Sequence, residues 1–350
     1  IVVGVLVGRY YSTRTVYYAD YIEQWGVPKG VHELSKDEVS HRRASYKFEI
    51  KKGNVQKLQL VNSKGKITRH NDTELYDRYE NAEFEYADNK QLSRIRINDP
   101  YGNCLYVLVF TGSKDDKKVI FQHEDGTATY SKKNTTSTDA MELSQRYIDD
   151  EVAKINGWNL VFDKETGFLL KRAYIDSDGY PACDGQMVYG KKYEYELNKK
   201  SVNYGKKTLE QFIDVQGNVI GDKIGLAQKA FGYDEKGNWI SCKYMDANGN
   251  PTSYSSQTYS TDIVNGYDEY GNLCSWKHFA EGQPVPIYGG AHEHKYTYDI
   301  NGFYSTYEYL DEKGQPVYDN GRVQVKYTND DNGYVTKECY YDENGNRFFN

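Results

Sequence analysis

The sequence predicts a mainly β protein: an antiparallel array of β-hairpin repeats in a meandering, solenoid-like sheet, with short N-terminal helices and one helical insertion. Two observations carry this prediction. A phrase of the type Tyr-Asp-x-x-Gly recurs, as at 233–237, and a second glycine turn follows it 12 residues later, as at Gly249. The segments between the turns, such as 239–245, are rich in aromatic and β-branched residues, which favour strands.

Each phrase is a turn with a chemical basis. Asp or Asn caps its own backbone, and glycine takes the left-handed conformation that a Cβ would penalise. A type I turn followed by a glycine bulge is a common hairpin connection of this length. Successive repeats begin 31 to 38 residues apart, so insertions lie between hairpins. The paired turn positions are Gly53/Gly65, Lys90/Gly102, Gly167/Gly179, Gly205/Gly217, Gly237/Gly249, Gly271/Gly282, Gly302/Gly314 and Gly333/Gly345.

The segments between these turns divide the chain. Residues 1–45 hold an apolar stretch and short helices, and 46–126 hold the first hairpin repeats. Residues 127–157 form a loop and a helical insertion, because the turn phrases stop there and an amphipathic pattern takes over from about 138 to 155. The second hairpin array covers 158–350.

The N-terminal part has two predicted features. Residues 1–7 are apolar and fit either the tail of a membrane anchor that precedes Ile1 or a first β-strand. Apolar residues of 12–34 recur every three to four positions, which predicts a short amphipathic helix. Ser35 and Glu38 form a capping-box pattern that opens a second short helix, ending near Ala44.

Composition limits the classes of partner. The formal net charge of −7 and the pI near 5.6 argue against nucleic acids and anionic membranes as general partners. The five cysteines have no CxxC spacing, so buried thiols or one or two disulfides between neighbouring repeats are both compatible with the sequence. Cys242 and Cys274 occupy nearby positions in adjacent repeats.

The turn phrases resemble those of YD-repeat (RHS-type) proteins, whose units read Tyr-Asp-x-x-Gly, a short strand and a second Asp-x-x-Gly turn. The resemblance covers about 46–126 and 158–350, with longer strands and a longer period here, and it implies a β-hairpin repeat fold. The matching phrases are 233–237, 267–271, 298–302 and 341–345.

A second resemblance concerns 17–28 and 40–48. These segments look like the juxtamembrane start of uncharacterised bacterial membrane-anchored repeat proteins. That likeness implies a repeat region on the extracytoplasmic side of the cell envelope, behind a membrane anchor.

Residues for catalysis or metal binding are sparse. His292 and His294 share one strand face and would hold a metal only with a third ligand, so alternating surface polarity is the preferred interpretation. No Gly-x-Ser-x-Gly, His-Glu-x-x-His or phosphate-binding glycine loop occurs. We therefore expect no catalytic residue, no metal and no cofactor.

An aromatic stripe is the remaining candidate site. Its rings lie on corresponding strands and can stack on sugar faces or grip a protein partner. Cross-strand pairs that hold a thin sheet together are the competing and favoured interpretation. The stripe consists of Tyr244, Trp276, Tyr307, Tyr309 and Tyr340.

These features predict a non-catalytic, extracytoplasmic repeat module that binds a protein or glycan partner at the bacterial cell envelope. Two other functions fit the sequence: a structural subunit that self-assembles into a larger cell-surface complex or filament, and a carbohydrate-active enzyme with a β-rich fold. A monodisperse monomer would count against the structural subunit. Two carboxylates at glycosidase distance in one cleft would favour the enzyme.

Overall fold

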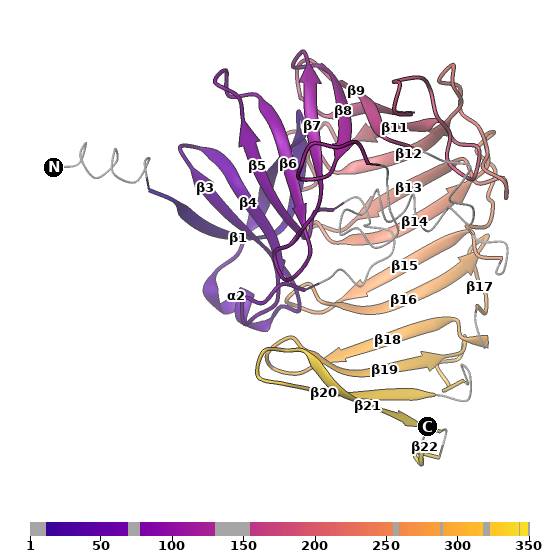
Figure 1. Ribbon diagram of the computed structural model, residues 1–350. Helices are drawn as coiled ribbons and strands as arrows, with labels where there is room; N and C mark the ends of the chain where they lie inside the picture. Colours follow the sequence, from indigo (N-terminus) through magenta and orange to yellow (C-terminus); the bar gives the residue numbers. More distant parts are fainter. Residues whose placement is uncertain are drawn as a thin grey trace.

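The computed structural model describes residues 12–68, 78–129, 155–254, 259–287, 290–317, 323–342 and 344–348 (Figure 1). The strands of these residues form one 22-stranded sheet, accompanied by the helix α2 (Lys36–His41). The N-terminal strands are β1 (Arg14–Gln24), β2 (Val27–Glu33), β3 (Ser45–Lys51), β4 (Asn54–Val61), β5 (Asn81–Tyr86), β6 (Leu92–Asn98), β7 (Cys104–Gly112) and β8 (Asp116–Gln122). The remaining strands are β9 (Gly157–Phe162), β10 (Leu169–Ile175), β11 (Gly190–Tyr195), β12 (Lys207–Ile213), β13 (Gln228–Tyr233), β14 (Trp239–Met245), β15 (Asp262–Tyr267), β16 (Leu273–Ala280), β17 (Gln283–Pro284), β18 (Glu293–Tyr298), β19 (Tyr304–Leu310), β20 (Gln324–Asn329), β21 (Val335–Tyr341) and β22 (Arg347–Phe348).

The strands follow one another in the sheet almost in chain order. Each strand from β3 to β16 pairs antiparallel with the next, and the same holds from β18 to β22. β16 also pairs with β17 and β18, and β1 pairs with both β2 and β3. Because β8 pairs with β9, the two predicted hairpin arrays form one continuous sheet. The predicted antiparallel hairpin array is confirmed.

The turns have the predicted hydrogen bonding. In the turn after β13, the Gly237 N–H donates to the Asp234 carbonyl at 3.1 Å, and the Asp234 N–H donates to the Asn238 carbonyl at 3.0 Å. The Asp234 carboxylate accepts a further bond, of 2.8 Å, from the Asn238 N–H. A β-bulge lies beside this turn in the β13–β14 pair, as expected for a type I turn with a glycine bulge. Lys90, which replaces glycine in one repeat, still adopts a left-handed φ of 64°.

Residues 14–33 form the β1–β2 hairpin, so the helix predicted within 12–34 is wrong. The apolar spacing was helical, but aromatic and β-branched residues favour strands, and β3 offers an edge with which β1 pairs. Trp25 and Gly26 form the hairpin turn, with φ of 52° and 81°. The residues whose spacing indicated a helix are Tyr17, Tyr18, Tyr21, Ile22 and Trp25.

The second N-terminal helix is confirmed. The Ser35 N–H donates to the Glu38 carboxylate at 2.8 Å, and the Glu38 N–H donates to the Ser35 hydroxyl at 3.2 Å, which completes the predicted capping box. The helix ends at His41, three residues before Ala44. The apolar stretch 1–7 and the predicted insertion helix, apart from its last residue, lie outside the described residues.

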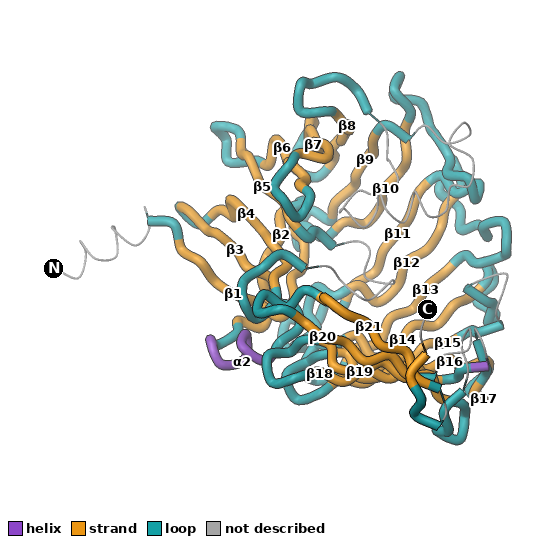
Figure 2. The backbone as a smooth tube through the Cα atoms, turned by 60° about the horizontal axis from the view of Figure 1, so that its bottom comes forward, coloured by secondary structure: helices purple, strands orange, loops and turns teal. Residues whose placement is uncertain are grey.

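The sheet is curved, and its inner face carries the core. In Figure 2 the strands bend round from β1–β8 through β9–β14 to β18–β21. In the first half, the fully buried side chains include Phe48, Leu58 and Ile95, together with the ring of Tyr21. In the second half, Trp239 and Tyr244 contribute larger rings to the same core.

The hairpin turns of the second half form two rows, at opposite ends of the strands. The first-turn row contacts the N-terminal segment 22–62, because a Cβ on any of its glycines would lie within 2.8 Å of that segment. The second-turn row is open in its later repeats, where no atom of the described residues lies within 4 Å of the same position. The first-turn row consists of Gly167, Gly205, Gly237, Gly271, Gly302 and Gly333, and the open glycines are Gly249, Gly282, Gly314 and Gly345.

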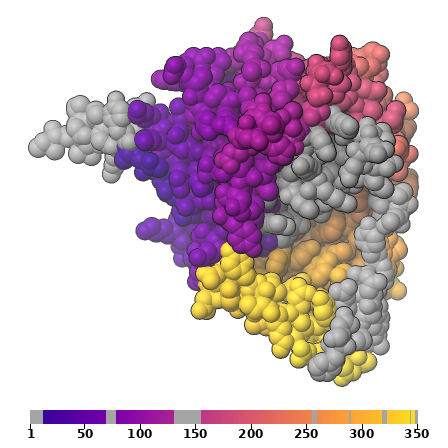
Figure 3. All heavy atoms as spheres, viewed as in Figure 1, coloured from indigo at the N-terminus to yellow at the C-terminus, as the bar shows by residue number. Residues whose placement is uncertain are grey.

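These contacts join the region after β4 to the last repeats of the chain. Asn62, after β4, donates its side-chain N–H to the carbonyl of Asn332 at 2.6 Å. Lys64 lies 3.1 Å from the side-chain oxygen of Asn301. Figure 3 shows the purple N-terminal strands against the yellow C-terminal strands at this point.

Candidate functional site

The strand register places the predicted aromatic stripe on one face of the sheet. Trp276 lies opposite His294, which in turn lies opposite Tyr309. Tyr307 and Tyr340 both lie opposite Val325 on β20. Because side chains alternate along a strand, Tyr307 and Tyr309 share that face.

Ring contacts join four residues of the stripe: Tyr244, Trp276, Tyr307 and Tyr309. Tyr244 reaches Trp276 through Tyr254 and His278, with successive ring centroids 5.1, 6.0 and 4.6 Å apart. His294 then joins Trp276 to Tyr309, at 5.1 and 5.4 Å. Such edge-to-face and tilted pairs stabilise the sheet beyond the area that they bury. The stripe therefore has the cross-strand role that was the favoured interpretation.

The stripe residues differ in exposure. Tyr244 and Tyr309 are 1% and 8% exposed and belong to the core. Trp276, Tyr307 and Tyr340 are partly exposed, so a ligand can reach their edges without unfolding the sheet. A part for any of the five in ligand binding stays a prediction.

The histidines are buried, so the interpretation of His292 and His294 as alternating surface residues is wrong. Both are less than 8% exposed, and His278 on β16 is fully buried beside them. Burial, reinforced by His294 and His292, lowers the pKa of His278 to about 3, so this imidazole is neutral at pH 7. Within the described ranges no group of three ligating side chains is arranged for a metal ion.

The ring contacts continue to a polar groove at the start of β19 and the end of β20. Tyr296 stacks on Tyr307 with centroids 4.8 Å apart, and Tyr304 lies 5.9 Å from Tyr296 and 5.7 Å from Tyr327. The groove has a volume of about 550 Å³. Its lining joins three rings with amide, hydroxyl, carboxylate and ammonium groups: Lys64, Asp299, Asn301, Phe303, Tyr304, Ser305, Tyr327, Thr328, Asn329, Asp330 and Asp331.

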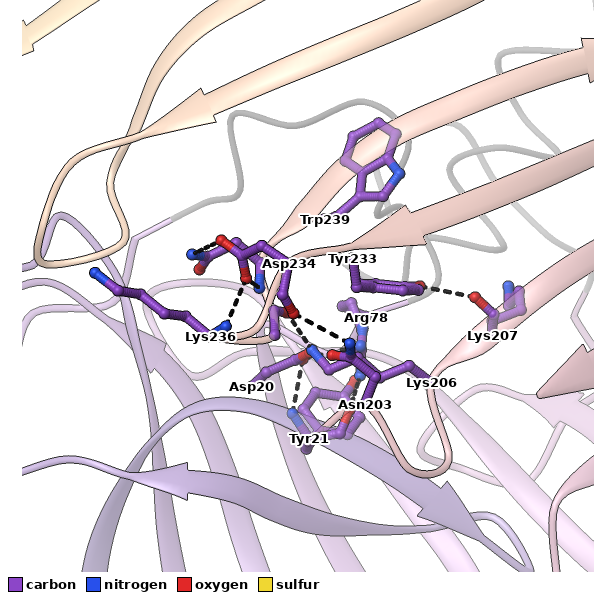
Figure 4. A network of polar contacts seen from close by, with 12 residues as sticks. Asp20, Tyr21, Arg78, Asn203, Lys206, Lys207, Tyr233, Asp234, Lys236 and Trp239 are labelled. Carbon is purple, nitrogen blue, oxygen red and sulfur yellow. Dashed lines mark hydrogen bonds and ion pairs between the residues drawn. The ribbon is translucent and has the colours of Figure 1, made fainter. Parts of the chain in front are cut away.

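A charged cluster joins the N-terminal hairpin to the repeat array (Figure 4). The Asp20 carboxylate lies 2.8 Å from the Arg78 guanidinium and 2.5 Å from the Lys206 ammonium. Lys206 also donates to the carbonyl of Gly237 in the first-turn row, at 2.5 Å. Burial alone would raise the pKa of Asp20, but the two cations hold it at about 2.

Sequence reasoning missed this cluster. Asp20 and Lys206 are 186 residues apart, and neither belongs to a recognisable motif. The cluster pairs its charges with one another, so its chemistry is structural: it fixes β1 against the connection before β12. Two small cavities flank it, of about 140 and 100 Å³, and both are lined by Arg78 and Tyr233.

Two further expectations concern cysteines and the membrane. All five cysteines are free, so neighbouring repeats are not joined by disulfides in this structure. Among the described residues, no helix is long and apolar enough to cross a membrane.

Comparison with known proteins yields structural likeness only. No protein-family profile and no curated protein matches the chain. The crystal structure of TcdB2-TccC3-Cdc42 matches at 12% identity and a TM-score of 0.28, over 83% of this chain and 15% of that one. The structure of TcdB2-TccC3 without its hypervariable C-terminal region matches at 15% identity and a TM-score of 0.29. That match covers 87% of this chain and 14% of the other. This chain thus spans about one-seventh of the length of those chains.

The β-hairpin repeat fold rests on the strand pairing of this chain itself. Membership of the YD-repeat (RHS-type) family stays a prediction, carried by the turn phrases described above.

Proposed function

We propose that the chain is a non-catalytic binding module on the extracytoplasmic side of the cell envelope, and that its partner is a glycan. The observation that supports this proposal is the groove between β19 and β20, where the chain of ring contacts ends among polar side chains. Sugars present apolar C–H faces and a fringe of hydroxyl groups. Tyrosine rings suit the faces, and amide and carboxylate groups suit the hydroxyls.

The dimensions of the groove fit this class of ligand. Its volume of about 550 Å³ lies in the range of small-molecule sites, which is about 300–1,000 Å³. Part of its polar lining is already fixed by the fold, since the Asn329 side chain donates to the Tyr304 carbonyl at 2.8 Å and the Asp330 carboxylate accepts from the Tyr334 N–H at 2.9 Å. A lining held in place before binding loses little conformational entropy when a ligand enters.

A glycan array followed by titration calorimetry tests the proposal on the full chain. The Tyr327→Ala variant should bind the selected glycan about tenfold more weakly, because it removes a ring from the groove. Tyr101→Ala is the control, since Tyr101 is 90% exposed and lies outside the groove. An array without binders, or equal loss in both variants, would overturn the proposal, and capture of a protein partner alone would replace the glycan.

The proposed location is supported by the apolar residues 1–7 and by the resemblance of 17–28 to membrane-anchored repeat proteins. We expect added protease to degrade the repeat region in cells whose outer layers have been opened but whose cytoplasmic membrane is intact. Protection from the protease until that membrane is lysed would place the region in the cytoplasm instead.

A second candidate is self-assembly through a sheet edge. β21 pairs with β20 along its length but with β22 only at Tyr340 and Tyr341, and the side chains of 335–338 are exposed. A strand with unpaired backbone groups is a template for another strand. A concentration-dependent shift from monomer to oligomer in sedimentation would favour this function, and a monodisperse monomer would exclude it.

A further inference from the structure

A second groove, at the opposite end of the sheet, has a different chemistry. It has a volume of about 480 Å³ and lies among the turn of the β1–β2 hairpin and the connections β3–β4, β5–β6 and β7–β8. Four lysines line it, and no aspartate or glutamate among the described residues does, although the whole chain has a net charge of −7. These lysines are Lys29, Lys90, Lys114 and Lys117.

Lys117 is the unusual member of this set. It is 4% exposed, and its ammonium group donates to the Trp25 carbonyl at 2.8 Å. The rings of Phe110 and Phe162 lie 5.6 Å away, and no described carboxylate pairs with it. Burial and the neighbouring Lys114 lower the pKa of Lys117 to about 8. An ammonium has three donors, and a buried one without a counter-ion is costly.

Trp25 links two of the cations. The Lys114 ammonium lies 3.6 Å from the centroid of its indole ring, so Lys114 and Lys117 meet the same residue. The indole N–H of Trp25 is buried and has no acceptor among the residues that the structure describes. Trp25 is also held at a φ of 52°, a left-handed value that non-glycine residues rarely adopt. Trp25 thus holds a buried donor without a described acceptor, and Lys117 holds a buried charge without a described carboxylate.

We propose that this groove binds a small oxyanion, a carboxylate or phosphate group, which supplies the missing counter-ion of Lys117. Lys29, Lys90 and Lys114 are exposed, so they attract the anion and complete its coordination at the mouth of the groove. The size of the groove suits a multivalent anion or the headgroup of an anionic lipid. This site is independent of the glycan groove, which lies at β19 and β20.

The test uses the full chain with two kinds of probe. Calorimetry and thermal melts with citrate and with pyrophosphate detect a soluble anion. Co-sedimentation with phosphatidylcholine vesicles, with and without phosphatidylglycerol, detects a lipid headgroup. We expect binding of at least one probe, weakened by added salt because the contacts are ionic. Binding of soluble anions alone identifies a small molecule, and binding of phosphatidylglycerol vesicles alone identifies a lipid.

Substitution of Lys117 separates a ligand site from a structural lysine. Lys117→Met removes an uncompensated buried charge, so the anion-free variant should melt at the same or a higher temperature, while the anion-induced shift disappears. Lys118→Met is the matched control, because Lys118 is the next residue and is exposed on the other face of β8. Lys90→Gln, at an exposed turn, should weaken binding about fivefold without affecting folding.

Three results would overturn the proposal: no probe binds the wild-type chain, Lys117→Met retains the anion-induced shift, or Lys118→Met loses it to the same extent. If Lys117→Met failed to fold, the outcome would depend on Lys90→Gln and Lys114→Gln, and unchanged affinity in both would overturn it.

Discussion

The two rows of turns have nearly the same sequence and backbone geometry but opposite surroundings. Gly302 and Gly314 flank β19 and have φ of 73° and 74°. A Cβ at Gly302 would lie 2.6 Å from backbone atoms of His41 and Arg42 at the end of α2, whereas no described atom lies within 4 Å of that position at Gly314. The first-turn row therefore closes hairpins and also packs against the N-terminal segment, whereas the later turns of the second-turn row meet no described part of the chain. The same glycine turn is thus a packing contact where the N-terminal segment covers it and an exposed turn where that segment is absent.

The largest expected effect concerns the charged cluster that fixes β1 to the repeat array. Asp20→Asn should lower the free energy of unfolding by about 3–5 kcal/mol, because it leaves Arg78 and Lys206 without their counter-ion. Urea denaturation measures the loss. Glu124→Gln is the control, since Glu124 pairs with Arg96 at the surface with its side chain 64% exposed, and its removal should cost about 1 kcal/mol or less. Equal effects would mean that the N-terminal hairpin adds little to stability.

The turn glycines give the most direct contrast between the rows. Gly302→Ala and Gly314→Ala share the strain of a left-handed alanine, about 1–2 kcal/mol. Gly302→Ala should cost about 2–3 kcal/mol more, because its methyl group meets backbone atoms of Arg42 and Arg43 that cannot move aside cheaply. Urea midpoints of the two variants check this difference. Matching midpoints would refute the contact between the first-turn row and the segment after α2.

The turn asparagines sharpen the comparison at a smaller scale. The Asn272 side chain donates to the His41 carbonyl at 3.0 Å and accepts from the Arg43 N–H at 2.8 Å, so it joins its turn to the end of α2. Among the described residues, Asn250, at the equivalent position of the second-turn row, forms hydrogen bonds within its own turn, to Asp246. Asn272→Ala should destabilise the chain by about 2 kcal/mol, because it leaves partly buried backbone groups unsatisfied. Asn250→Ala should destabilise the chain clearly less. Calorimetric unfolding of both variants measures the difference in stability between them.

An effect of similar size, about 2 kcal/mol, is expected from the pH dependence of the Asp20 contribution. The folded-state pKa of Asp20, about 2, lies below the ordinary value of 3.8, so the ionised carboxylate stabilises the fold. That contribution is complete above about pH 4 and is lost as the pH falls from 4 toward 2. The stability difference between wild type and Asp20→Asn should therefore be constant from pH 5 to 7 and shrink by about 2 kcal/mol below pH 4. A difference that grows in acid would contradict the pairing with Arg78 and Lys206.

Local chemistry explains what could be predicted. The hairpins, their bulges and the capping box of α2 depend on hydrogen bonds within about five residues, such as Asp234 with Asn238, and these are visible in the sequence. The helix predicted within 12–34 was wrong because its spacing was read without the neighbouring strand β3, which supplies the pairing edge. His292 and His294 were misplaced for a related reason. The alternation of side chains along a strand predicts which face of the sheet a residue lies on. It does not predict whether other residues bury that face.

The sequence alone therefore determined the repeating unit: antiparallel strands, glycine-bulge turns, and aromatic rings in register along one face. Only the tertiary structure decided how the sheet curves, and hence that the N-terminal segment packs against one row of turns and that Lys117 is buried with no described carboxylate beside it. The physical reason is distance along the chain. A turn forms among neighbouring residues, whereas the contact between Asn62 and Asn332 spans 270 residues and exists only because many small strand-to-strand twists add up.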